Sequence, residues 1–286
     1  MTISLDTITK LYLVINLCFQ LNASRDLPDF PKESSMRVFE GIPVPLGELP
    51  YQVAFKTRHP KKDNSYYTFC GGAIIGESKL LSAAHCFVHQ DYEYMCFKDT
   101  YPLALYGKYA VAATLRNIAY EELEHEQWRT LLNLTYPKDY AFPNNDIAIL
   151  FVTQPFFFNN YVKPIKYSDT YQDLDGICLV SGYGRVSHTI SSDSLLKAHL
   201  LVLSRYWCDV VHGRDTSATI CTSIIGSDIG KGDSGGPLVY CNDCEPENYK
   251  NGMLVGIASG TYYGLNSVFT RVSSYYDFIE RNHCDK

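Results

Sequence analysis

Short apolar segments, rich in valine, isoleucine, tyrosine and phenylalanine, recur along this chain from Pro50 onward, and turn signals separate them. β-branched and aromatic residues favour strands, and runs of this length with such boundaries are typical of strands. The sequence therefore predicts an all-β body built from many short strands. Clear examples are 51–55, 72–75, 103–106 and 146–151.

Two stretches depart from this pattern. Residues 120–132 are charged and contain no proline or glycine, so they fit a helical insertion or an exposed loop equally well. The last segment, 274–283, is predicted to be a helix, because Ser274 and Asp277 form a capping pair at its start. Its apolar face is also spaced as in a helix: Tyr275, Phe278 and Ile279.

Length, charge and cysteine content narrow the class of protein. The 286 residues suit one large domain or two small ones, and 46% of them are hydrophobic. The net charge of −6 comes without long charged runs, so no nucleic-acid partner is indicated. Ten cysteines favour an oxidising compartment. Metal binding is the alternative, but Cys241 and Cys244 form only one isolated CxxC pair.

The N-terminus also indicates secretion. Lys10 precedes an apolar run, 11–19, and the small residues Ala23 and Ser24 follow it. This pattern predicts a signal peptide over 1–23. The run is shorter than the roughly 20 residues that a membrane span needs, so no membrane association is expected. Residues 24–37 are polar with two prolines and are interpreted as a leader segment outside the core.

The stretch Gly230–Leu238 holds a serine, Ser234, among four glycines. Glycine allows sharp turns and a close approach of the backbone to a ligand. Ser234 is therefore a candidate nucleophile for attack on a carbonyl carbon, with the N–H groups of Gly232 and Ser234 directed at the resulting oxyanion. The alternative is an ordinary glycine-rich turn between strands.

A serine hydroxyl needs a base, and the chain offers one candidate with a partner acid. His85 follows two alanines, which leave room for close packing, and precedes Cys86, which could fix the loop. Asp146 follows two asparagines and precedes an apolar segment. Each has a simpler interpretation, as a structural histidine and as a turn residue that opens a strand.

Taken together, the motifs SAAHC, NDIAIL and GKGDSGGPLV resemble those of the secreted serine proteases of the chymotrypsin and trypsin type. The order His, Asp, Ser along the chain is that family's order. The resemblance runs from Val38 to about the C-terminus. It implies a protease domain over 38–286 with two antiparallel β-barrels, roughly 38–154 and 155–272, an active site in the cleft between them, and a C-terminal helix.

The resemblance also assigns roles to single residues. His85 would take the proton of Ser234 and later give it to the leaving amine, while Asp146 would hold the imidazole in the correct tautomer. Ser259 stands where the family's serine hydrogen-bonds the triad aspartate. Neither a metal nor a cofactor is implied.

Residues 37–41 stand at the family's activation site. Cleavage between Arg37 and Val38 by a trypsin-like protease would free the Val38 ammonium, which would pair with Asp233 and form the oxyanion hole. The chain is thus expected to be a zymogen.

The specificity pocket departs from the family pattern. Asp228 stands at the position of the acid at the floor of the trypsin pocket, which implies cleavage after lysine or arginine. Gly260 replaces a wall tryptophan, and Thr261 and Ser267 replace glycines that keep the pocket open. Gly230 replaces a cysteine, and the facing segment 260–268 lacks the matching one.

The cysteines follow the family only in part. The resemblance implies the pairs Cys70–Cys86 and Cys208–Cys221. Cys178 is expected to pair with Cys241, although the usual partner position is Tyr240 and a bulge would be needed. Three cysteines have no family partner: Cys96, Cys244 and Cys284.

The sequence therefore predicts a secreted serine endopeptidase made as a zymogen. Its expected partners are a polypeptide substrate, an activating trypsin-like protease and a serine protease inhibitor. The altered pocket and unassigned cysteines leave one alternative, a non-catalytic secreted protease homologue that acts as a binding or regulatory module. Asn133 opens a glycosylation sequon and is expected on a surface loop before Asp146.

Overall fold

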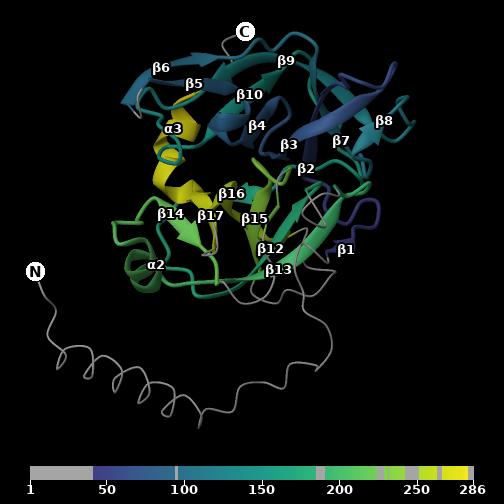
Figure 1. Cartoon of the computed structure of the whole chain (residues 1–286). Coiled ribbons are helices and arrows are strands. Elements are labelled where there is room, and N and C mark those ends of the chain that lie inside the picture. The colour runs from purple at the N-terminus through teal and green to yellow at the C-terminus, as the bar shows by residue number, and fades with distance from the viewer. Residues whose placement is uncertain are drawn as a thin grey trace, which may run out of the picture. The chain divides into compact units, whose positions relative to one another are not determined.

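The structure, a computed structural model, describes residues 41–93, 96–184, 191–223, 229–230, 232–241, 251–262 and 266–282. Two large β-sheets, almost entirely antiparallel, form the framework of this part of the chain (Figure 1). The predicted all-β class is confirmed. None of the helices in these ranges is long and apolar enough to cross a membrane. The predicted signal peptide, the leader and the activation residues Arg37 and Val38 lie outside the described residues.

The first sheet closes into a six-stranded barrel in the order β2-β7-β9-β10-β4-β3, because β3 pairs again with β2, and β8 adds to β3 at the side. Val53 lies opposite both Gly72 and Ala112, so β2 lies between β3 and β7. The strands are β2 (Gln52–Arg58), β3 (Tyr66–Ile74), β4 (Lys79–Ser82), β7 (Lys108–Ala112), β8 (Ile118–Ala119), β9 (Gln127–Thr135) and β10 (Ala148–Val152).

The second sheet runs in the order β1-β13-β12-β15-β16-β17-β14, and β11 pairs with β16. A bridge between Val202 and Thr222 brings β14 to the end of β13, so the sheet curls around its own core. The strands are β1 (Ile42–Pro43), β11 (Lys166–Tyr167), β12 (Gly176–Gly182), β13 (Leu196–Val202), β14 (Thr219–Cys221), β15 (Pro237–Tyr240), β16 (Met253–Tyr262) and β17 (Asn266–Arg271). Residues 42–43 therefore pair with the second sheet, although they precede every strand of the first sheet in the chain.

Smaller elements complete the described chain. The 3-10 turn η3 (Ala84–Cys86) follows β4 of the first barrel. A hairpin of β5 (Val88–Glu93) and β6 (Cys96–Pro102) comes next. The expected strand at 103–106 is wrong, because β6 ends at Pro102 and a turn follows. The helix α2 (Arg205–His212) precedes β14, and η5 (Val272–Tyr275) leads into α3 (Tyr276–Arg281).

The C-terminal helix is shorter than predicted. Ser274 lies in the 3-10 turn η5 and not at the N-cap of α3. The N-cap residue is Tyr275, whose side chain makes no capping hydrogen bond. Asp277 instead pairs with Arg281 at 3.1 Å. The apolar face is as expected, because Ile279 is fully buried. The undecided stretch 120–132 is irregular up to residue 126 and then continues as β9.

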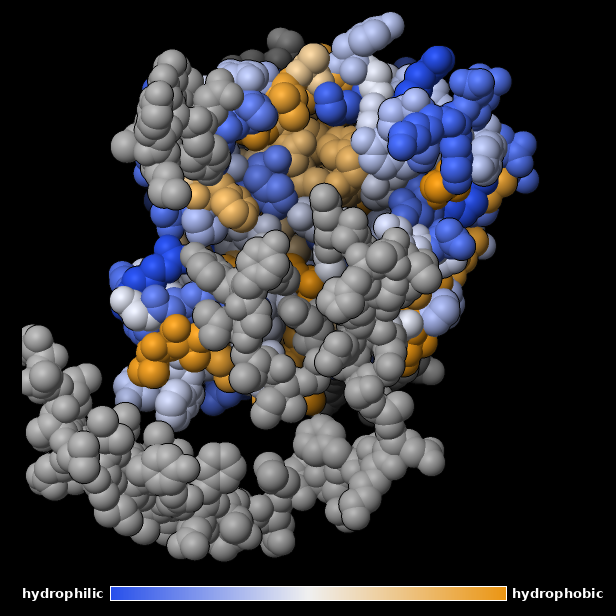
Figure 2. Space-filling view, in the orientation of Figure 1, coloured by the Kyte–Doolittle hydropathy of each residue, from blue (hydrophilic) through white to orange (hydrophobic). Residues whose placement is uncertain are grey.

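Two apolar clusters form the interior, one larger and one within the second sheet. Burying a side chain of the size of Phe55 or Ile149 contributes about 1.5–3 kcal/mol each. Figure 2 shows apolar surface near the position of α2, where Val210 is 55% exposed, while hydrophilic residues cover much of the upper right of that face. Charged side chains inside the fold are costly unless they are paired, so they mark places of interest: Lys56, Glu126, Asp146, Lys197, Asp233 and Arg271.

Candidate active site

The structure brings His85 and Asp146 together. His85 lies in η3 just after β4, and Asp146 lies two residues before β10, which pairs with β4. The Asp146 carboxylate accepts two bonds, from the backbone N–H of His85 at 2.9 Å and from its Nδ1 at 2.8 Å. A carboxylate at Nδ1 favours the tautomer with the proton there, which leaves the Nε2 lone pair available to act as a base.

Asp146 is fully buried and receives further bonds from the second sheet. The Ser259 hydroxyl on β16 donates to Oδ2 of Asp146 at 2.5 Å, and the Thr270 hydroxyl on β17 donates to its carbonyl at 2.7 Å. The bonds from His85 and Ser259 offset the cost of burying the carboxylate, and the Thr270 bond holds the backbone of Asp146. Ser259 thus has the position expected from the sequence, whereas Thr270 was not foreseen. The pair stands where the first barrel meets the second sheet.

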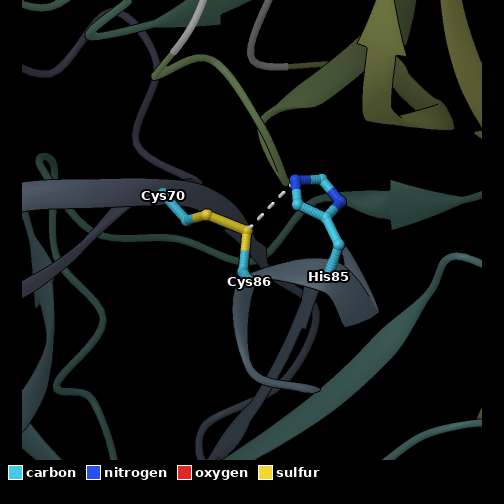
Figure 3. Close-up of side chains that lie close together, drawn as sticks. All are labelled: Cys70, His85 and Cys86. Atoms are coloured by element: carbon cyan, nitrogen blue, oxygen red, sulfur yellow. Dashed lines mark hydrogen bonds between the residues drawn. A yellow bond between two sulfur atoms is a disulfide. The ribbon is translucent and has the colours of Figure 1, made fainter. Parts of the chain in front are cut away.

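A disulfide between Cys70 on β3 and Cys86 holds the segment that carries His85. Figure 3 shows this disulfide beside the imidazole, with Sγ of Cys86 3.9 Å from Nε2 of His85. The three side chains are close enough to suit a metal ion. Both sulfur atoms are oxidised, however, and a metal requires thiolate ligands, so this cluster is a structural clamp.

Backbone bonds attach the loop that carries Ser234 to the strands that support this pair. The N–H of Gly71, which follows Cys70 on β3, donates to the Ser234 carbonyl at 2.8 Å. The N–H of Gly235 donates to the carbonyl of Ala258 on β16 at 2.8 Å, one residue before the serine that holds Asp146. The loop of the candidate nucleophile is therefore attached to both strands that support the histidine and the aspartate.

This attachment requires glycine at position 235. Gly235 has a φ of +76°, and a Cβ there would lie 2.2 Å from Oγ of Ser82 and 2.5 Å from the Gly71 carbonyl. Any side chain would push the loop away from β3 and β4. Gly232 also has a positive φ, +112°, which side chains rarely adopt. The glycines around Ser234 thus have the turning and close-approach roles that the sequence indicated.

Asp233, one residue before the candidate nucleophile, is buried with 1% of its surface exposed. Its carboxylate accepts the N–H of Gly184 at 2.7 Å and the N–H of Gly230 at 2.8 Å. A Cβ at Gly184 would lie 2.3 Å from this carboxylate, so only glycine fits beside it. The expected partner Val38 lies outside the described residues.

Part of the predicted specificity pocket is described. Ser267 is fully buried, and its hydroxyl accepts the N–H of Ile229 at 3.0 Å. Ile229 directly follows Asp228, so the serine lies close in space to the backbone beside the predicted acid. Asp228 itself and the side chain of Thr261 lie outside the described residues.

Phe142 is a site residue that the sequence analysis missed. Its ring packs edge-on against His85 with the centroids 5.5 Å apart, and it is 41% exposed. A Cβ at Gly260 would lie 3.4 Å from this ring, so Phe142 occupies space beside the position where the family has a wall tryptophan. The signal was present in the sequence, because Gly260 leaves a gap that an aromatic residue close to Asp146 could fill.

Two of the three expected disulfides are confirmed: Cys70–Cys86 and Cys208–Cys221. The pair Cys178–Cys241 is wrong. Cys178 on β12 is a free, buried thiol, and burial raises its pKa to about 12. It lies opposite Tyr240 in an unbroken register, so the bulge that would deliver Cys241 is absent from this strand pair, and successive side chains point to opposite faces. Cys241 belongs to a different disulfide.

A closed β-barrel, a second, almost entirely antiparallel sheet, a histidine bonded to a buried aspartate and a glycine-flanked serine on a loop attached to both sheets are typical of the class of trypsin-like serine proteases. The family model described as Trypsin matches residues 38–279. The chain therefore belongs to the trypsin family.

Curated relatives support this assignment. Serine protease 1 of Rattus norvegicus is 28% identical over 261 residues, 88% of this chain and 92% of the relative. Trypsin-1 of Astacus astacus is 30% identical over 251 residues, and Chymotrypsin-2 of Vespa crabro is 30% identical over 249 residues. Each of these two alignments covers 85% of this chain and 98% of the relative. Because a trypsin and a chymotrypsin are equally similar, overall identity does not decide which residue this chain cleaves after.

Proposed function

We propose that the protein is a secreted serine endopeptidase that uses Ser234 as nucleophile, His85 as base and Asp146 as the orienting acid. The observation that carries the proposal is the Asp146 carboxylate, which is fully buried and accepts bonds from both the ring and the backbone of His85. Such a carboxylate orients the imidazole and stabilises the imidazolium that forms during proton transfer.

The chemistry proceeds in two halves. Nε2 of His85 takes the proton of the Ser234 hydroxyl while Oγ bonds to the carbonyl carbon of the peptide. The N–H groups of Gly232 and Ser234 stabilise the oxyanion, and the C–N bond then breaks as His85 gives its proton to the leaving amine. Water enters, loses a proton to His85 and releases the acyl group from Ser234 by the reverse sequence.

Synthesis as a zymogen is part of the proposal. Asp233 is a buried carboxylate whose described bonds are to backbone N–H groups, and it adjoins Ser234. The proposal assigns the freed Val38 ammonium to this carboxylate, because pairing with an opposite charge stabilises a buried carboxylate. The order of events is then cleavage after Arg37 by a trypsin-like protease, insertion of the new N-terminus, and completion of the oxyanion hole.

The experiment that tests the function is labelling with a fluorophosphonate, which reacts with activated serine nucleophiles. After treatment with trypsin, the wild-type protein should be labelled at Ser234, and Ser234→Ala should not be labelled. Arg37→Gln, which the activating protease does not cut, should be labelled far more slowly. Absence of label in cut wild-type protein would instead favour the alternative, a non-catalytic homologue with a binding or regulatory role. The altered pocket around Gly260 and Ser267 is the reason for this alternative.

Further partners follow from this function. The substrate is a polypeptide, and a serine protease inhibitor that inserts a substrate-like loop would occupy the same site. The expected surface loop at Asn133 is wrong, because Asn133 lies within strand β9, opposite Phe151. Its side chain is nevertheless exposed, which suits the proposed glycan.

A further inference from the structure

Lys56 on β2 is a lysine with no exposed surface. Its ammonium donates to the Thr68 hydroxyl at 2.9 Å and to two carbonyls, those of Arg116 at 2.6 Å and Asn117 at 2.8 Å. Burial lowers its pKa to about 7, while Glu126 acts to raise the pKa and Arg116 to lower it further. Lysine is seldom fully buried, because its charge is costly away from water. The role of Lys56 is therefore expected to lie in the segments that its three bonds hold in place, at Thr68 and at Arg116 and Asn117.

These bonds can be satisfied in either charge state. The protonated amine donates all three hydrogens, and the Thr68 hydroxyl meanwhile donates to the Asn117 carbonyl at 3.0 Å. A neutral amine still has two hydrogens for the two carbonyls and can accept the Thr68 hydroxyl instead. Lys56 therefore fixes the turn 114–117 from inside the first barrel throughout the neutral pH range.

The turn 114–117 is bonded on its other side to the second half of the chain. The Asn117 amide donates to the carbonyl of Ser192 at 2.7 Å and to that of Tyr183 at 3.3 Å. In return, the Tyr183 hydroxyl donates to the carbonyl of Thr114 at 2.8 Å. The turn held by Lys56 thus holds the segment at Tyr183.

Tyr183 leads directly to the loop of the candidate nucleophile. The next residue, Gly184, donates its N–H to the Asp233 carboxylate at 2.7 Å. Gly232 lies against Gly184, since a Cβ added at Gly232 would lie 3.1 Å from the Gly184 Cα. A continuous set of hydrogen bonds and contacts therefore runs from Lys56, through the turn 114–117 and residues 183–184, to Gly232 and Asp233. Gly232 supplies one N–H of the predicted oxyanion hole, and Asp233 directly precedes Ser234.

We propose that Lys56 is a positioning residue for the loop that carries Ser234, acting through Asn117, Gly184 and Asp233. Its effect on turnover rests on the proposed protease function, whereas its effect on the position of the loop does not. Displacement of catalytic groups by about 1 Å can lower a rate by about a hundredfold, so a residue far from the chemistry can control it in this way.

The main variant is Lys56→Met, which keeps the length of the side chain but removes the hydrogen bonds. Lys79→Met is the matched control, because Lys79 also donates to a carbonyl, that of Ile279, but lies outside the network. In activated protein, Lys56→Met should lower kcat at least about tenfold, with KM changed much less. Lys79→Met should leave kcat within about twofold of wild type. A merely structural lysine would change the stability but not the kcat of the folded enzyme.

Hydrogen–deuterium exchange supplies a measurement that does not depend on activity. Lys56→Met should speed exchange at residues 182–184 and 232–236, and Lys79→Met should not. Asn117→Ala should have the same effects, and the double variant should add little, because both residues act through one connection. Should Lys56→Met fail to fold, Thr68→Val, which removes one acceptor at nearly constant shape, replaces it.

Unchanged exchange at 232–236 in these variants would overturn the inference, as would an unchanged kcat. If cut wild-type protein is not labelled by the fluorophosphonate, the proposed function fails, and the exchange measurement alone decides the role of Lys56.

Discussion

At the scale of single residues, Asp146 is a buried carboxylate whose hydrogen bonds orient the imidazole of His85. Its side chain is removed from water, yet its oxygens receive the His85 backbone N–H, the His85 ring and the Ser259 hydroxyl. The turn η3 from the first half of the chain and strand β16 from the second half thus converge on one carboxylate. These bonds fix the orientation of the His85 imidazole. A histidine on the surface without such bonds would change its orientation freely.

We predict that Asp146→Asn lowers kcat by about three to four orders of magnitude while the protein remains folded. An amide can donate to Nδ1 of His85, and it then favours the tautomer with its proton on Nε2, which cannot accept the proton of Ser234. Thr270→Val is the control, because it removes a bond to the Asp146 backbone only. Turnover of a peptide substrate by both variants checks this, and a rate close to wild type in Asp146→Asn would contradict the assigned role.

The same residue scale gives a prediction for the pH dependence of stability. Lys56 has a pKa lowered to about 7 in the folded protein, whereas in the unfolded chain its pKa is the ordinary lysine value of 10.5. Between these values the unfolded state binds more protons, so this group makes the folded state more stable as pH rises through that window. Below about pH 7 the full cost of the buried charge is present.

Wild type should therefore gain stability relative to Lys56→Met between pH 7 and pH 9, by at most about 1.4 kcal/mol per pH unit. Urea unfolding of both proteins at the two pH values, with the disulfides intact, measures the difference. Methionine cannot titrate, so a gap that stays constant would show that Lys56 is not charged differently in the two states. Glu126 and Arg116 face Lys56 and are unchanged in the comparison.

At the scale of elements, the segment 114–128 is organised by one ion pair. Arg116 binds both carboxylate oxygens of Glu126, at 3.0 and 2.9 Å, and the Trp128 ring N–H donates to the same carboxylate at 3.0 Å. Burial acts to raise the pKa of Glu126, but the bonds from Trp128, Thr114, Leu123 and Arg116 outweigh it, and the pKa is lowered. The irregular segment before β9 thus has a buried polar centre in place of a helix.

We predict that Glu126→Gln destabilises the protein by about 2–4 kcal/mol, because it leaves the Arg116 guanidinium without its charged partner. Asp277→Asn is the matched control, since the Asp277–Arg281 pair is exposed, and such pairs contribute about 0–1 kcal/mol. Chemical unfolding of both variants measures the two losses. Equal losses would show that burial of the Glu126 pair has no energetic consequence.

Elements also show where prediction from sequence succeeds. Strands with a continuous apolar run, such as 146–151, appear nearly where expected, because burial on both faces leaves a strong pattern. The segment 120–132 could not be assigned, since its conformation depends on a partner, Arg116, that precedes it in the chain. The Cys178–Cys241 error has a related cause, because the register of β12 against β15 decides which side chains meet, and the cysteine spacing alone does not fix it.

At the scale of the whole molecule, the barrel class and the meeting of His85 with Asp146 follow from the sequence because three motifs each carry local chemistry. The connection from Lys56 to Asp233 does not. It depends on a lysine inside a strand, where the pattern indicates an apolar residue, and on contacts between segments more than 60 residues apart. Phe142 was missed for a similar reason, because its contact with Gly260 joins the two halves.

Substrate choice is the property that most depends on the assembled molecule, because charge and shape oppose each other in the pocket. If Asp228 lies at the pocket floor, its carboxylate favours lysine or arginine and penalises apolar side chains. If Ser267 lines the pocket, as the family resemblance implies, it acts against long side chains, because it adds volume beside Ile229 where the family has glycine. A misfit of one or two methyl groups costs about 1–3 kcal/mol, and a buried carboxylate left unpaired costs more.

Charge should therefore outweigh width, and we predict cleavage after arginine and lysine at a rate limited by Ser267. Peptide substrates with Arg, Lys, Ala, Val or Phe before the scissile bond should be compared by kcat/KM in wild type, Asp228→Ser and Ser267→Gly. Asp228→Ser should lose most of the preference for Arg and Lys, whereas Ser267→Gly should improve those substrates about tenfold or more by restoring depth. A preference for Ala or Val that persists in Asp228→Ser would show that width decides, and that Asp228 does not face the substrate.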